Sequence, residues 1–282
     1  MISKLGLRPK IFLWTCLLIV ALPGIAAADP VTFIGSGSNA ASIQATVDAF
    51  RNALGNPING NNPGPLLSGR REINWDGGGG VSTTTLSPNP FNGFQATRGA
   101  LFTTPGSGFV QATTSGMATT FNNPGYDGAF AVFSPLRLFS AIGSNVIDVT
   151  FTVPGSLTQA AINGFGVVFS DVDLANSATL QFFDLNNNLL GTFSAPTANN
   201  GLSFLGVLFN AGEQVGRVRI TSGNAAPGPN DGAGVDIVLM DDFIYSEPQP
   251  VPEPATILLL GTGLAGTAAT FRRRRKQKGV DD

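Results

Sequence analysis

Residues 145–155 read NVIDVTFTVPG, and this stretch indicates the fold class more clearly than any other part of the chain. Apolar Ile, Val, Phe and Val alternate with Asp and Thr, which is the period of a β-strand with one face in solvent. The Pro154–Gly155 pair then breaks the pattern, as turn residues do between short strands. The stretch therefore predicts an antiparallel strand that packs one face on a core.

Similar short strands are expected on both sides of this stretch, separated by Gly, Pro and Asn turns. They lie at 71–76, 100–103, 109–113, 164–173, 178–196 (a hairpin around 186–188), 217–221 and 235–245. One short helix is expected near the N-terminus, because Ile43, Val47, Phe50 and Leu54 recur at helical spacing. The pattern predicts an all-β fold, an antiparallel jelly-roll-like β-sandwich over residues 29–246.

The charge of the chain excludes some classes of function. Only 12% of the 282 residues are charged, and residues 29–250 hold seven arginines, no lysine and fifteen acids, a net charge of −8. This acidic body lacks the basic footprint that nucleic acid requires, so no nucleic-acid partner is expected. The chain has no histidine, which removes the usual general base and the commonest zinc ligand. We expect a protein that is not an enzyme.

The N-terminus has the pattern of a secretory signal peptide over residues 1–28. Lys4, Arg8 and Lys10 precede an apolar run at 11–21, and small residues Ala26 and Ala28 mark a cleavage site for signal peptidase. An uncleaved membrane anchor is the alternative. The signal predicts export of the chain.

The C-terminus shows a second targeting pattern. After an expected linker at 247–250 comes a segment at 251–276, in which 255–271 has no charge and would form a helix of about 25 Å, marginal for a membrane span. Arg272, Arg273, Arg274 and Arg275 follow as a stop-transfer cluster that holds the trailer 277–282 in the cytoplasm. A transmembrane helix is therefore expected at 255–271.

The residues VPEP, an apolar span and an arginine cluster together resemble the PEP-CTERM sorting signal of Gram-negative bacteria. The resemblance implies that Pro252, Glu253 and Pro254 are the recognition element for an exosortase. That enzyme would remove the tail of an inner-membrane-anchored precursor and pass the protein to the cell surface or an exopolysaccharide matrix, as in biofilms. A simple tail anchor is the alternative.

The body resembles an uncharacterised extracellular domain associated with PEP-CTERM proteins. The strings REINWDG (71–77), GFGVVFSDVDLANS (164–177) and VLMDDFIY (238–245) carry this resemblance, which covers most of residues 42–245. It implies a sandwich fold and no established activity.

Acidic residues near strand ends form the first candidate site. Asp171 and Asp173 follow one expected strand, and Asp241 and Asp242 lie in another. Carboxylate oxygens suit Ca²⁺, so one structural cation between these strand ends is a hypothesis, and no other cofactor is expected. The run from Asp184 has the start of a calcium loop, but an Asn-rich hairpin turn is the preferred interpretation.

Aromatic residues in glycine-rich loops form the second candidate site. Trp75 with Asp76, and Tyr126 with Asp127, would supply an aromatic platform and polar groups for a glycan. The competing interpretation makes Trp75 a core residue.

We therefore expect a secreted, exosortase-sorted protein with a structural or adhesive role in exopolysaccharide or the envelope. The first alternative is a carbohydrate-binding module, with or without calcium. The second is a glycoside hydrolase that pairs two acids from a set that includes Glu72 and Glu213.

Overall fold

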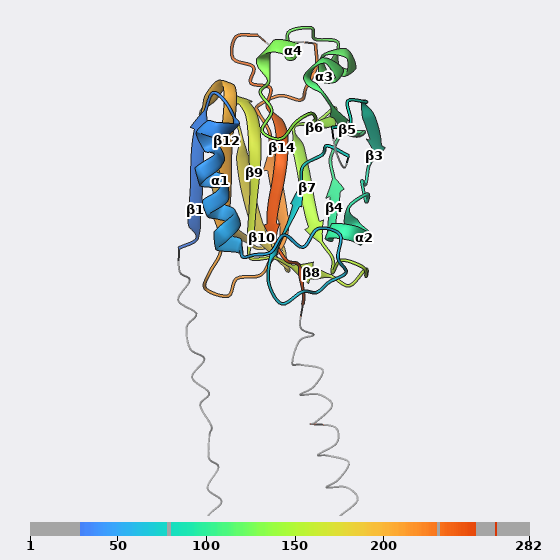
Figure 1. Ribbon diagram of the computed structural model, residues 1–282, viewed down its shortest axis with the longest axis vertical. Helices are drawn as coiled ribbons and strands as arrows, with labels where there is room; N and C mark the ends of the chain where they lie inside the picture. The colour runs from blue at the N-terminus through green and yellow to red at the C-terminus, as the bar shows by residue number, and fades with distance from the viewer. Residues whose placement is uncertain (1–28, 78–79, 230–231, 252–262, 264–282) are drawn as a thin grey trace, which may run out of the picture.

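The computed structural model describes residues 29–77, 80–229, 232–251 and 263. These residues form a β-rich fold of two antiparallel sheets packed face to face, with helices on one face and at one end (Figure 1). The expected all-β class is thereby confirmed. The expected signal peptide at 1–28, the triplet Pro252–Glu253–Pro254 and the four arginines at 272–275 lie outside the described residues.

The larger sheet has eight strands among the described residues. Its order is β1 (Val31–Gly37), β12 (Ala198–Leu208), β9 (Gly164–Val172), β14 (Leu239–Ser246), β6 (Leu138–Ile142), β5 (Gly108–Ala112) and β3 (Thr85–Pro88). The eighth strand, β2 (Arg70–Ile73), pairs with the second half of β14.

The smaller sheet has five strands in the order β11 (Leu189–Ser194), β10 (Thr179–Asp184), β13 (Val215–Thr221), β7 (Val146–Phe151) and β4 (Ala100–Thr103). A two-stranded ribbon joins β8 (Ala160–Ala161) to β15 (Gln249–Pro250). A jelly roll is built from eight strands in two Greek keys, so sheets of eight and five strands do not confirm that topology.

The main core lies between the two sheets. Inward residues of β7, Ile147 and Val149, are buried there while Asp148 and Thr150 are half-buried on the other face, as the opening stretch predicts. Strands β9 and β14 are buried along their whole length, since the smaller sheet covers one of their faces and helices or loops cover the other.

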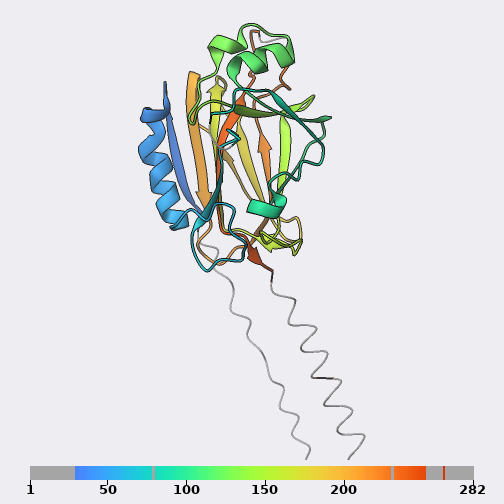
Figure 2. The same cartoon turned by 45° about the vertical axis from the view of Figure 1, so that its right-hand side comes forward.

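The helix α1 (Ala40–Leu54) packs on the outer face of the larger sheet (Figures 1 and 2). Asn39 caps its first turn by accepting a hydrogen bond from the Ser42 amide, and Gly55 ends it. Its buried residues are Ile43, Val47 and Phe50, three of the four expected from the helical spacing, and the fourth, Leu54, is partly buried.

Three short helices, which the sequence pattern did not predict, complete the fold. They are α2 (Gln95–Arg98), α3 (Thr114–Phe121) and α4 (Tyr126–Ala129), and the last two cap one end of the sandwich (Figure 1). The start of β1 and the strand β8 lie at the opposite end, which we call the base (Figures 1 and 2).

Residues 247–250, expected as a linker, belong to the fold. Glu247 is buried, and β15 pairs with β8. These residues are not a free linker, because the backbone of Gln249 pairs with that of Ala161 in the antiparallel ribbon of β8 and β15.

No helix within the described parts of the chain is long and apolar enough to cross a membrane. The span expected at 255–271 lies, apart from Gly263, outside those parts.

Candidate functional site

Three buried carboxylates converge on one serine at the outer face of the larger sheet. The Oγ of Ser134 lies 3.0 Å from Asp76, 3.1 Å from Asp241 and 2.7 Å from Asp242. A β-bulge aims the last two side chains, because Asp241 and Asp242 together occupy the place opposite the single residue Val168 of β9. We call these four residues the Ser134 cluster.

The Ser134 cluster has too few protons for its acceptors. One hydroxyl can donate one hydrogen, so it cannot satisfy three ionised carboxylates at once. Burial raises the pKa of Asp241 well above its ordinary value, and the neighbouring Asp242 raises it further. Burial also raises the pKa of Asp242, against the opposing effects of Ser134 and Arg51. The cluster therefore favours retention of a carboxyl proton.

Backbone amides supply most of the remaining hydrogen bonds to these carboxylates. Asp241 accepts from the amide of Phe133 at 2.6 Å, and Asp76 accepts from the amide of Arg137 at 2.9 Å. The Ser134 cluster thus fixes the loop between α4 and β6 onto strand β14, which is a structural role.

A cation from the helix borders the Ser134 cluster. Arg51 of α1 lies 3.4 Å from Asp242 and 2.8 Å from Glu72, and Glu72 also pairs with Arg70 at 2.6 Å. These ion pairs connect α1 to both β2 and β14.

Trp75 lies inside the core, where it cannot contact a glycan. Its side chain is 1% exposed, stacks on Phe139 with ring centroids 3.7 Å apart, and donates its indole N–H to the carbonyl of Asp241 at 2.8 Å. Asp76 is buried in the Ser134 cluster. The hypothesis of an aromatic platform at this position is therefore wrong and the core interpretation of Trp75 is confirmed, because core packing covers the ring.

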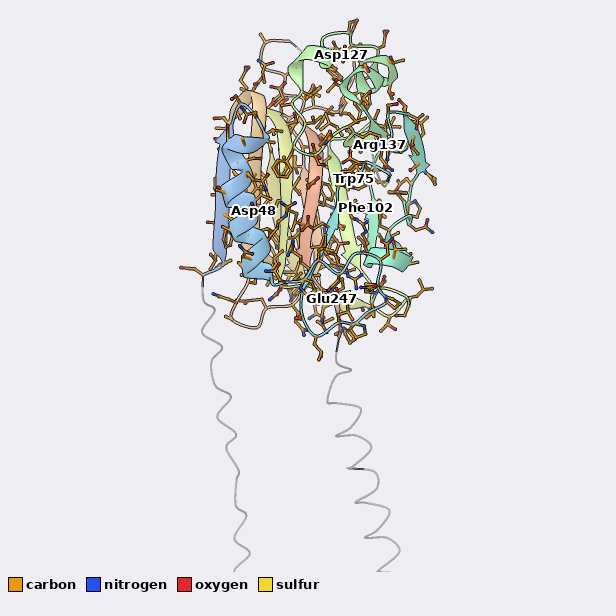
Figure 3. The ribbon with its side chains drawn as sticks, in the orientation of Figure 1. Asp48, Trp75, Phe102, Asp127, Arg137 and Glu247 are labelled. Carbon is orange, nitrogen blue, oxygen red and sulfur yellow. The ribbon has the colours of Figure 1, made fainter. Side chains whose placement is uncertain are left out.

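Tyr126 is buried in a separate core, near the end of the sandwich opposite the base. It packs on Phe121 and Phe130, and its hydroxyl donates to the carbonyl of Gly228 at 2.9 Å. Asp127 is exposed and accepts from Thr114 at 2.9 Å. Figure 3 shows Asp127 at that end and Trp75 in the middle of the sandwich. The four predicted glycan residues do not form one site, and both rings are unavailable.

Asp171 and Asp173 line an open pocket of about 380 Å³ together with Asn199 and Asn200. Asp171 accepts from the Asn200 amide at 2.6 Å, and burial, followed by Asp236, raises the pKa of Asp173. Asp236 accepts from the amides of Asp173 and Leu174, so it caps this turn.

The two predicted acidic pairs have different partners. Asp241 and Asp242 meet at Ser134, whereas Asp171 and Asp173 adjoin Asp236 and the asparagines. Within the described ranges, no three Asp, Glu, His or Cys side chains are arranged to hold a metal ion. The observed partners of the two pairs therefore give no support to a single shared cation.

The remaining acids also have structural partners. Asp184 accepts from the amides of Asn186 and Asn188, each at 2.8 Å, so this run forms the Asn-rich hairpin turn. Glu213 accepts from the amide of Ala211 at 2.9 Å, and Glu72 is held by arginines.

The base contains a buried ion pair that sequence reasoning missed. Arg71 and Glu247 form two hydrogen bonds at 2.5 and 2.6 Å, and Arg71 also donates to the carbonyls of Gly60 and Asn62. Figure 3 shows Glu247 at this end of the sandwich. The only sequence signal was an arginine in a short strand and an acid just after another, which is too common to identify a pair.

The folded part of the chain continues up to Val251. Its amide donates to the carbonyl of Gln159 at 3.4 Å, and Gln249 donates to the carbonyl of Leu66 at 2.7 Å. The residue after Val251 is Pro252. No spacer therefore separates the folded body from the proline–glutamate–proline triplet.

A comparison with known protein families identifies this segment. Residues 250–275 match the model of the PEP-CTERM protein-sorting motif. A comparison with curated proteins gives no match. The motif implies export, a membrane-anchored precursor and processing by an exosortase for the cell surface. The chain accordingly carries a PEP-CTERM sorting motif, which begins at the last strand of its β-rich body.

Proposed function

We propose that the chain is a non-catalytic structural or adhesive protein of the exopolysaccharide matrix or envelope of a Gram-negative bacterium. The observation that carries this proposal is the sorting motif at 250–275, whose first two residues, Pro250 and Val251, are still paired with or bonded to the body. In this proposal, signal peptidase removes residues 1–28, and the span at 255–271 holds the precursor until an exosortase acts.

The partners of the acidic side chains support a non-catalytic role. A general acid or base has to reach a substrate proton within hydrogen-bond distance. The carboxylates of Asp76, Asp241 and Asp242 are buried and bonded to Ser134, and Glu247 is buried against Arg71. These groups organise the fold.

The carbohydrate-binding alternative loses its main support, since the rings of Trp75 and Tyr126 are both buried. The adhesive role we propose therefore depends on the surface of the sandwich as a whole. Its sparse charge and many exposed Asn, Ser and Thr side chains suit hydrogen bonding to a hydrated polysaccharide.

Intact-mass analysis of the protein extracted from the cell surface tests the sorting step. The expected mature chain starts at Asp29 and lacks residues 257–282. A mature chain that retains Arg272 to Arg275 would contradict exosortase processing and leave the simple tail anchor.

A deletion strain tests the proposed role. We expect altered matrix or biofilm in the deletion strain and no binding of the purified protein to a glycan array through Trp75 or Tyr126. Turnover of a glycoside by the purified protein would contradict the non-catalytic role.

A further inference from the structure

Two loops lie beside residues 249–251, at the end of the described body, and are hydrogen-bonded to those residues and to each other. Gln249 donates to the carbonyl of Leu66, and Val251 donates to the carbonyl of Gln159. The amide of Gly64 donates to the carbonyl of Pro154 at 2.8 Å, which joins the two loops. Loops 57–69 and 153–159 therefore form a continuous rim around the point where the sorting motif begins.

This rim carries exposed apolar side chains. Leu67 is 104% exposed and Leu157 is 79% exposed, and no other large apolar side chain in the described parts of the chain is as exposed as these two. Ile58, on the same loop as Leu67, is 52% exposed. Val31, 41% exposed, is the first residue of β1, which starts at the same end (Figures 1 and 2).

The surroundings of these residues give them no packing role. Loop 57–69 is otherwise composed of Asn, Gly, Pro and Ser with one further leucine, which is the composition of a solvated turn. A fully exposed leucine adds nothing to the core of such a loop. Isolated exposed apolar residues are common on proteins, but a group of them at one exit point is the pattern of a contact surface.

The number of residues between Val251 and the uncharged run indicates what this surface faces. Val251 is hydrogen-bonded to the body, and the uncharged run begins at Ala255. Four residues reach at most about 14 Å when fully extended. The polar layer on one side of a bilayer is about 5–8 Å thick. With the run 255–271 in the membrane, the rim lies within reach of the lipid surface.

The buried ion pair at the base does not oppose this contact. Arg71 and Glu247 neutralise each other in a buried pair. The approach of the rim to a membrane therefore does not desolvate either of these charges without its partner. Because the tail tethers the body, even a weak contact would be formed most of the time.

We propose that the rim formed by Ile58, Leu67 and Leu157 docks the body on the lipid surface while the tail is in the membrane. The docking fixes the orientation of the sandwich and holds the proline–glutamate–proline triplet at the headgroup level. This inference rests on the proposed function, since it uses the predicted span at 255–271.

The test uses the full chain with Cys16→Ser, reconstituted into vesicles of phosphatidylethanolamine and phosphatidylglycerol that contain a doxyl-labelled lipid. Single variants Leu67→Cys and Leu157→Cys carry an environment-sensitive fluorophore. Leu86→Cys and Leu174→Cys are controls, because these leucines are 65% and 39% exposed and lie away from the rim, the first on β3 and the second just after β9, at the end opposite the base. Each variant also carries Trp14→Phe, so that blue-shifted emission of Trp75 confirms that the variant is folded.

We expect several-fold stronger lipid quenching at positions 67 and 157 than at positions 86 and 174. Equal quenching at all four positions in chains that float with the vesicles would overturn the docking and leave the anchoring intact. A blue-shifted label without lipid quenching would indicate a second copy of the chain on the rim and would also overturn it. Failure of the chain to float with vesicles would overturn both the docking and the anchoring.

Discussion

Arg71 and Glu247 form a buried two-point ion pair that ties β2 to the residue just after β14. Asn59 donates to the same carboxylate at 2.8 Å, and the amide of Leu66 lies 3.3 Å from its other oxygen. One glutamate therefore holds loop 57–69, strand β2 and the start of the C-terminal tail in place. These contacts make the segment from Glu247 onward, as far as it is described, part of the folded body.

Glu247→Gln is expected to lower the free energy of unfolding by about 3–5 kcal/mol, because it leaves the buried Arg71 guanidinium without its countercharge. Urea unfolding of the wild-type and variant chains measures this change. Asp48→Asn is the matched control, because Asp48 pairs with Arg51 on an exposed face and its loss should cost less than about 1 kcal/mol. Equal effects of the two substitutions on the free energy of unfolding would show that the buried Arg71–Glu247 pair stabilises the fold no more than an exposed ion pair does.

Trp75 is the only tryptophan after residue 28, so it reports on the core of the processed chain. We expect its emission to be blue-shifted in the folded chain and to move to the red on unfolding, since the ring is buried against Phe139. Trp75→Ala should cost about 3–5 kcal/mol, the range for large aromatic truncations in a core. Leu136→Ala, at an exposed position, should change stability little. Quenching of the folded chain by aqueous iodide as strong as that of free tryptophan would contradict the buried position.

The sequence predicted strands with one solvent-exposed face better than strands that are buried on both faces. Strand β7 was found because Asp148 and Thr150 alternate with apolar residues. Strand β12 was missed, because Gly201 to Val207 are all buried and show no alternation. Short helices α3 and α4 were missed because their residues are Gly, Ser, Thr and Asp, which favour turns as much as helix.

The candidate sites were harder to predict than the fold, since a residue's type does not give its burial. Trp75 beside a glycine run is typical of a binding loop and of a core residue alike, and only the packing of Phe139 and Phe243 on its ring decides between them. The convergence of Asp76 with Asp241 depends on a contact 165 residues apart in the chain, through Ser134. No local pattern contains that information.

The Ser134 cluster should contribute more to the stability of the folded body in mild acid than at neutral pH. The pKa of Asp241 is raised in the folded state by burial and by Asp242, so the folded state binds more protons than the unfolded state above about pH 4. Stability then falls as the pH rises from about 4 through the raised pKa. Asp241→Asn should remove this fall, which unfolding midpoints from pH 4 to 8 measure.

Asp148→Asn is the control of opposite sign. Burial would raise the pKa of Asp148, but hydrogen bonds from Arg219 and Arg217 outweigh it and lower the pKa. Its stabilising effect is present above the ordinary carboxyl range and is lost as the pH falls through the lowered pKa. The Asp148→Asn chain should therefore differ from wild type most at neutral pH and least in acid. Parallel pH profiles for wild type and Asp241→Asn would contradict the proton held by the Ser134 cluster.

Gly166 and Gly206 face each other across β9 and β12, and the ring of Phe50 from α1 lies on both. A Cβ at either glycine would come within 2.8 Å of that ring. Gly166→Ala should therefore push α1 off the sheet and cost about 1–3 kcal/mol, the usual range for an overpacked core. Gly128→Ala in α4 is the matched control, because nothing lies within 4 Å of a Cβ there.

The second variant Phe50→Leu removes the obstructing ring, so Gly166→Ala should cost less in that background. Urea unfolding of the four chains gives the coupling, and equal costs of Gly166→Ala in both backgrounds would show that the ring of Phe50 is not the reason these positions are glycine.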